Sequence, residues 1–217
     1  FMDHYDPKTV FSSIDSHGRY SFANQPPITK WNLARFAECL IPLIDKDQEE
    51  AIKTATETIN NFEKIYEVKW LNMMRDKLGL FGEDKNDKIL IEDLLNWMEK
   101  NKADYTNTFC NLMNIKTSNN EIYNNKDYIN WTNKWQKRIL LNNSSKDKSL
   151  KLMKNSNPVV IPRNHKVEEA LKEANENNLE VMNKLLSILT KSYENQKNIE
   201  DFQSPSNTKE YQTFCGT

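Results

Sequence analysis

The stretch from residue 12 to residue 25 carries the densest set of side chains that could do chemistry. It reads SSIDSHGRYSFANQ, and its acid and base, Asp15 and Arg19, stand four residues apart. At that spacing the two side chains can form an ion pair, or Arg19 can instead hold a phosphate through its planar guanidinium. The alternative is a folded loop whose polar groups satisfy its own backbone. Taken by itself, the segment favours this alternative.

A second pattern resembles the start of a calcium-binding loop. Asp84 and Asn86 stand where an EF-hand supplies its first oxygen ligands, but the fifth position is Lys88 and the sixth is Ile89. An EF-hand needs an oxygen at the fifth position and a glycine at the sixth. The sequence therefore favours a loop between helices, with Asp87 as a helix cap.

The histidines and serines form no recognisable catalytic or metal-binding set. His4, His17 and His165 are far apart and lack the spacing of metal ligands. His165 opens a predicted helix, where a structural role is favoured over a catalytic one. A Ser/His/Asp triad assembles in space, so spacing alone identifies none here.

Composition narrows the possible partners and compartments. The four glycines include no pair at phosphate-loop spacing, and the net charge of −1 gives no field that would attract nucleic acid. No apolar run reaches ~18 residues, so we expect no membrane span. Cys39, Cys110 and Cys215 show no paired spacing, which indicates a reducing compartment such as the cytoplasm.

The 217 residues suit one domain, or a domain with a helical extension. The first residue is Phe, and the opening FMDHY has no pattern of a signal or transit peptide. We therefore expect a fragment of something longer.

Hydrophobic periodicity predicts a mainly α fold with few or no strands. Irregular structure is expected over 1–27, a loop over 116–125, an extended segment over 157–162 and coil after 193. The predicted helices are 28–44, 47–78, 88–100, 104–115, 126–141, 146–154, 166–175 and 178–192.

Several local features refine these helices. The helix over 28–44 has a broad apolar face and is predicted to be buried, with Pro42 near its end. Asp45 or Asp47 is the predicted cap of 47–78, and Leu78–Gly79 its stop. Asp104 is expected to cap 104–115, and Cys110 to lie in the core. Trp131 and Trp135, one turn apart, are expected to hold helices together.

Seven stretches together resemble the SelO/YdiU family of pseudokinases. They are FMDHYDP (1–7), DSHGRYSFANQP (15–26), WNLAR (31–35), WLNMMRDKLGL (70–80), DYTNTF (104–109), NPVVIPRNH (157–165) and YQTFCGT (211–217). These motifs are long and unusual, and they run along the whole chain.

The resemblance implies a protein-kinase-like fold that transfers AMP or UMP, from ATP or UTP with Mg²⁺ or Mn²⁺, to protein hydroxyls. In such proteins the catalytic lysine, the phosphate-binding arginines and the metal-binding residues precede the motif at 1–7. No catalytic or metal-binding residue is therefore assigned here, and no nucleotide or metal is expected to bind this chain tightly.

What remains resembles the carboxyl-terminal part of the fold. The implied division is an activation-segment-like loop over 1–27, a helical carboxyl-lobe core over 28–115, and a helical extension and tail over 116–217. The candidates for shaping the loop or admitting a protein substrate are Asp15, Arg19, Asn24, Gln25 and Asn32.

The resemblance also implies a candidate for redox control. Some family members join the activation segment to a carboxyl-terminal cysteine by a disulfide. Cys215 stands at that tail position, but Phe11 stands where its partner would be, and Cys39 on the following helix is a poor substitute.

Two hypotheses of function follow. The chain is part of a protein nucleotidyltransferase, inactive alone and dependent on an amino-terminal half, or it is a helical protein-binding module derived from that family. The expected partners are the missing half and protein substrates. A homo-oligomer formed through exposed apolar surface is also expected.

Overall fold

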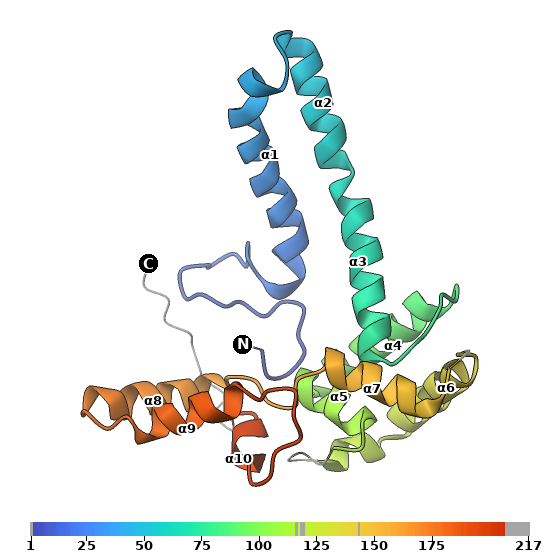
Figure 1. The fold of residues 1–217 in the computed structure, drawn as a ribbon, viewed down its shortest axis with the longest axis vertical. Coiled ribbons are helices and arrows are strands. Elements are labelled where there is room, and N and C mark those ends of the chain that lie inside the picture. Colours follow the sequence, from blue (N-terminus) through green and yellow to red (C-terminus); the bar gives the residue numbers. More distant parts are fainter. Residues whose placement is uncertain (1, 116, 118–119, 143, 207–217) are drawn as a thin grey trace. The chain divides into compact units, whose positions relative to one another are not determined.

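The computed structural model describes residues 2–115, 117, 120–142 and 144–206, and these form a mainly α fold as predicted (Figure 1). Their only β pairing is an isolated bridge between His4 and Asp104. None of the described helices is long and apolar enough to cross a membrane. The helices are η1 (Phe22–Asn24), α1 (Gln25–Ile44), α2 (Gln48–Asn60), α3 (Phe62–Lys77), α4 (Asp87–Asn101), α5 (Tyr105–Leu112), η2 (Asn120–Asn124), α6 (Lys126–Leu140), α7 (Lys146–Ser156), α8 (Asn164–Asn175), α9 (Glu180–Leu189) and α10 (Glu200–Gln203).

The chain divides into two compact units. The first contains the described residues of 1–6 and 73–213, and the second contains residues 7–72. Each unit is described by itself below. The three-part division at residues 27 and 115 stays a prediction.

In the second unit, α1 and α2 form an antiparallel hairpin (Figure 1). Asp47 caps α2 as predicted, because its carboxylate accepts the backbone N–H groups of Glu49 and Glu50 at 2.9 and 3.3 Å. Pro42 lies inside α1, which ends two residues later.

The prediction of one helix over 47–78 is wrong, because α2 and α3 are separate helices with a break at Asn61. The backbone N–H of Asn61 donates to the carbonyl of Thr58, three residues back, at 3.2 Å. Asparagine forms helices weakly, and this tighter bond ends α2 where two asparagines follow one another.

The prediction that the first long helix is buried is also wrong, since α1 has no buried residue within this chain. Helix α2 packs against α1 but leaves all of its residues at least partly exposed, because the apolar residues of α1 spread over a broad face. Trp31, Phe36 and Leu43 remain 47%, 61% and 81% exposed.

In the first unit, two tryptophans of α6 fasten neighbouring helices, as predicted. The indole N–H of Trp131 donates to the carbonyl of Leu90 in α4 at 2.8 Å, and that of Trp135 donates to the carbonyl of Leu78 at 2.9 Å. The two indole rings stack with centroids 6.2 Å apart. Each ring thus contributes packing and also satisfies a carbonyl near the end or the start of another helix.

Gly79 ends α3 as predicted, and its position excludes a side chain. Its φ is +68°, and a Cβ built there would lie 2.8 Å from the carbonyl oxygen of Ser149. Glycine is therefore required both by the left-handed backbone and by the close approach of α7.

Asp87 does not take the predicted capping position, which Asn86 occupies. The Asp87 carboxylate is buried and accepts hydrogen bonds from Arg75 Nε and Arg138 Nε at 2.7 Å each, and from the Asp84 backbone N–H at 3.0 Å. Burial alone would raise the pKa of Asp87, but the bonds from Arg138, Asp84 and Arg75 outweigh it and lower that pKa. One carboxylate thus joins α3, α4 and α6.

Three segments predicted to be irregular contain helical residues, and the first of them, over 1–27, includes the 3₁₀ turn η1 and the start of α1. The loop over 116–125 includes the 3₁₀ turn η2, and the tail after 193 includes α10. The side chains of Phe202 in α10 and of its N-cap residue Ile199 are both buried, but the turn is too short to give a periodic signal. The segment over 157–162 is neither helix nor strand, and its first residue, Asn157, has an extended backbone with φ −127° and ψ 115°.

Lys77 is buried beside aromatic rings at the end of α3. Its Nζ lies 4.3 Å from the ring centroid of Phe109 and 5.3 Å from that of Tyr105. Burial lowers the pKa of Lys77 to about 8, although the nearby thiol of Cys110 acts weakly in the opposite direction.

We expect Asp87→Ala to destabilise the first unit by about 3–5 kcal/mol, because it leaves Arg75 and Arg138 buried without their shared carboxylate. The matched control is Asp93→Ala, which removes a solvent-exposed partner of Lys134 and should cost about 0–1 kcal/mol. Urea unfolding measures both. Equal losses in the two variants would contradict the role of Asp87.

We expect the stability of the protein to depend on pH through Lys77. An unfolded lysine keeps its proton up to about pH 10.4. The folded protein releases the Lys77 proton near pH 8. Between these values the unfolded state binds more protons at Lys77, so the contribution of Lys77 to stability rises by about 2–3 kcal/mol as pH rises. The free energy of unfolding of Lys77→Met should lack this rise, and parallel profiles for the two proteins would contradict the assignment.

Candidate functional site

The segment that precedes α1 is an ordered loop that closes on itself. The backbone N–H of Ala23 donates to the carbonyl of Pro7, and that of Phe22 donates to the carbonyl of Thr9, both at 2.9 Å. Turns linked by backbone hydrogen bonds fill the interval between them. The loop therefore has a fixed shape before it passes through η1 into α1.

Asp15 organises the middle of this loop. Its Oδ1 accepts the backbone N–H of Arg19 and its Oδ2 that of Tyr20, each at 2.8 Å. Gly18 between them has a φ of +66°, which lets the chain turn back over the carboxylate. The carboxylate thus binds the backbone at Arg19 and Tyr20, as the folded-loop interpretation predicts.

Of the other residues predicted to shape the loop, Asn24 and Gln25 form hydrogen bonds to it and Asn32 does not. The side-chain amide of Asn24 donates to the carbonyl of Gly18 at 2.8 Å, and that of Gln25 donates to the carbonyl of Tyr20. Asn32 is exposed on α1. The structure therefore brings Asp15, Arg19, Asn24 and Gln25 together as parts of one loop, and Asn32 lies outside this hydrogen-bonded set.

The side chain of Arg19 lies over aromatic rings. Its guanidinium carbon is 4.5 Å from the ring centroid of Trp31 and 5.7 Å from that of Tyr20. Arg35 lies 5.5 Å from the same Trp31 ring and forms an ion pair with Glu38 at 2.6 Å. Two guanidinium groups thus flank one exposed indole.

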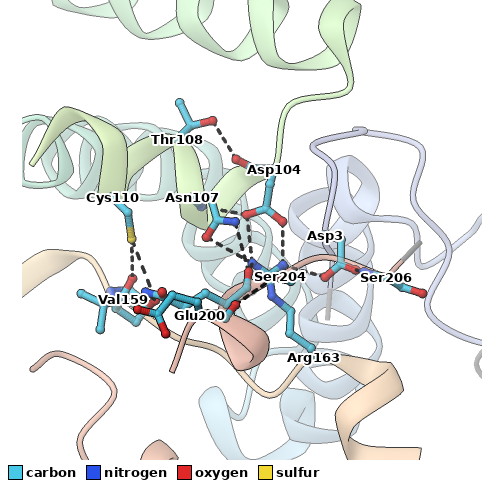
Figure 2. A network of polar contacts seen from close by, with 12 residues as sticks. Asp3, Asp104, Asn107, Thr108, Cys110, Val159, Arg163, Glu200, Ser204 and Ser206 are labelled. Atoms are coloured by element: carbon cyan, nitrogen blue, oxygen red, sulfur yellow. Dashed lines mark hydrogen bonds and ion pairs between the residues drawn. The ribbon is translucent and has the colours of Figure 1, made fainter. Parts of the chain in front are cut away.

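A separate network in the first unit is centred on Arg163, whose side chain is fully buried (Figure 2). Its Nη1 donates to Asp3 Oδ1 at 2.7 Å and to Asp104 Oδ2 at 2.6 Å. Its Nη2 donates to Asp104 Oδ1 at 3.1 Å and to the carbonyl of Gln203 at 2.7 Å. Asn107 joins the same network by donating to that carbonyl at 3.1 Å.

The charges in this network depend on one another. Burial works against the charge of Arg163, but the carboxylates of Asp104 and Asp3 outweigh it and raise the pKa of the guanidinium. Burial also raises the pKa of Asp104, and the two contacts from Arg163 oppose that effect. Asp104 additionally caps α5, as predicted, by accepting the Asn107 backbone N–H at 2.7 Å.

Sequence reasoning did not single out Asp3 or Arg163, and it assigned Asp104 only a capping role. A signal was present, because the three residues stand in three of the family-like motifs. Those motifs are at residues 1–7, 104–109 and 157–165. Their convergence on one buried guanidinium shows that these motifs encode a packing framework.

The described residues contain no cluster of the side chains that most often bind metal ions. None of their His, Cys, Asp and Glu side chains form a group of three or more that could hold a metal ion. The interior carboxylates of Asp87 and Asp104 are bound by arginines. No reaction step through a metal is therefore derived from this part of the chain.

The two described cysteines differ in environment. Cys39 is exposed on α1, whereas Cys110 is buried and carries a free thiol. Burial raises the pKa of Cys110 to about 12, which keeps it a protonated core residue as predicted. Cys215, the candidate for redox control, lies outside the described residues.

Comparison with known proteins identifies the family of this chain. The sequence model of the family described as "Protein adenylyltransferase SelO" matches residues 1–190. The chain therefore belongs to the SelO family.

Curated relatives carry a related name. The chain is 59% identical to "Protein nucleotidyltransferase YdiU" of Pelagibacter ubique and 49% identical to the protein of the same name from Alkaliphilus metalliredigens. It is 50% identical to that of Clostridium botulinum strain Loch Maree. Each alignment covers 100% of this chain and 45% of the relative. The chain thus spans about half the length of the curated relatives it matches.

We expect Asp15→Ala to speed amide hydrogen exchange at Arg19 and Tyr20 by about tenfold or more, because both N–H groups lose a charged acceptor. Asp15→Asn, which keeps one acceptor oxygen, should have a smaller effect. Asp47→Ala is the control, since it should speed amide hydrogen exchange at Glu49 and Glu50 and leave exchange at Arg19 and Tyr20 unchanged. Unchanged exchange at Arg19 would contradict this account of the loop.

Proposed function

We propose that this chain is the carboxyl-terminal part of a SelO-like protein nucleotidyltransferase. The complete protein transfers AMP or UMP from a nucleoside triphosphate to Ser, Thr or Tyr hydroxyls of other proteins, with Mg²⁺ or Mn²⁺. The observation that carries the proposal is the family match over residues 1–190. We place this pseudokinase-like protein in the cytoplasm of a bacterium, in keeping with its bacterial relatives.

The described residues support a structural and substrate-facing part in that reaction. The Arg163 network links three family-like motifs in one framework. The closed loop over 7–23 presents Arg19 and Tyr20 at its surface, where an activation segment meets a protein substrate. The residues that bind the nucleotide and the metal are supplied by the remaining part of the protein, which we propose as the first partner of this chain.

The apolar surface of α1 supports the need for a partner. Phe36 and Leu43 are 61% and 81% exposed on one helix, and a soluble protein rarely leaves such apolar side chains uncovered. The alternative proposal, a helical module that binds proteins without catalysis, draws on the same surface. A third proposal is a homo-oligomer formed through this face, and size-exclusion chromatography of the chain alone tests it.

The test is reconstitution. This chain is mixed with a separately produced remainder of the Pelagibacter ubique relative, and transfer of labelled AMP and UMP onto protein acceptors is followed with Mg²⁺ or Mn²⁺. We expect no transfer by the chain alone and transfer by the mixture. The control is the Pelagibacter ubique protein divided at the matching place and rejoined, which shows whether such halves can associate.

Two results would refute the proposal. One is transfer, or tight binding of ATP with its metal, by the chain alone. The other is a mixture that forms a stable complex but transfers no nucleotide, while the divided and rejoined Pelagibacter ubique protein is active. That result would favour the non-catalytic module. Size-exclusion chromatography of the chain alone reports whether the exposed face instead drives self-association.

A further inference from the structure

An exposed cluster of Arg19, Tyr20, Trp31 and Arg35 has the chemistry of a recognition site. Trp31 and Tyr20 are 47% and 46% exposed, although they are large aromatic residues. The Arg19 guanidinium lies over the Trp31 ring at 4.5 Å, with Arg35 on the same ring at 5.5 Å. Tryptophan, tyrosine and arginine are also the residues enriched at the energetic centres of protein interfaces.

The position of Arg19 is set before any ligand arrives. Asp15 holds the backbone N–H of Arg19 at 2.8 Å, and Asn24 holds the carbonyl of the preceding Gly18 at 2.8 Å. The Trp31 ring then holds the guanidinium carbon 4.5 Å from its centroid. This contact uses no N–H group in an ion pair, so the planar fork of the guanidinium can still donate to a planar acceptor.

The charge of Arg19 lacks a partner within the described residues, since none of their carboxylates forms an ion pair with it. Ion pairs between other residues of its unit join Lys30 to Glu63, Arg35 to Glu38 and Lys53 to Glu50. The Asp15 carboxylate accepts backbone N–H groups. The cluster therefore presents one uncompensated positive charge beside a second, partly neutralised guanidinium.

We propose that this cluster binds the carboxylate of an acidic side chain in the protein substrate, near the hydroxyl to be modified. This inference rests on the proposed function, and it names the substrate class: hydroxyl residues flanked by Asp or Glu. A single uncompensated guanidinium matches one carboxylate, whereas a polyphosphate carries several negative charges. The aromatic rings beside it supply apolar contact for the neighbouring peptide.

The test measures peptide binding to the 217-residue chain without nucleotide, by fluorescence anisotropy. One labelled peptide has a central tyrosine flanked by glutamates, and its pair has glutamines in their place. We expect the glutamate peptide to bind about tenfold more tightly, as a charged hydrogen bond predicts. Equal binding of the two peptides overturns the proposal.

Three variants locate the site. Arg19→Gln should abolish the preference for glutamate, and Arg19→Lys should retain part of it, because lysine keeps the charge without the planar fork. Lys64→Gln is the matched control, since it removes one positive charge from an exposed position of the same unit and should leave the preference intact. If Arg19→Gln and Lys64→Gln lost the preference for glutamate equally, net charge alone would explain the preference, and the assignment of the site to Arg19 would be wrong.

Competition separates carboxylate from phosphate. Inorganic phosphate at the concentration of a competing glutamate peptide should displace the labelled peptide weakly, and strong displacement would reassign the cluster to phosphate. Because these measurements use no nucleotide transfer, failure of the reconstitution above would leave the binding result standing, and failure here would leave the proposed transferase intact.

Discussion

The buried guanidinium of Arg163 is the interaction on which the first unit depends. A charge held away from water is costly unless it is paired and hydrogen-bonded, and here two aspartates and a backbone carbonyl supply that pairing. Since the partners come from the start of the chain, from α5 and from α10, one side chain dictates where three distant segments meet. The packing of those segments is thereby made specific as well as compact.

The sequence predicted the fold class and most helices, because their apolar residues recur with helical period. It also predicted the caps at Asp47 and Asp104 and the stop at Gly79, since each depends on local backbone chemistry. It failed where tertiary context decides. The exposure of α1 depends on which surfaces are present to cover it, and the turn of α10 depends on the burial of Ile199 and Phe202.

For the candidate site too, the sequence predicted the contacts that depend on local chemistry and missed those that depend on the fold. The folded-loop interpretation anticipated that Asp15 would satisfy the loop's own backbone, because an aspartate near a glycine turn has a local use. No spacing rule indicated that Arg19 would lie over Trp31, twelve positions along the sequence, or that Arg163 would reach Asp3. Such contacts link sequence positions that only the fold brings together.

The distance along the chain between Asp3 and Arg163 has a consequence for the order of folding. Their ion pair joins residues separated by 160 positions, so it closes a very long loop and pays the corresponding entropy late. During synthesis the ribosome releases Asp3 long before Arg163 exists. The segment at residues 2–6 must therefore wait for the helices between them, and its attachment marks the completion of this unit.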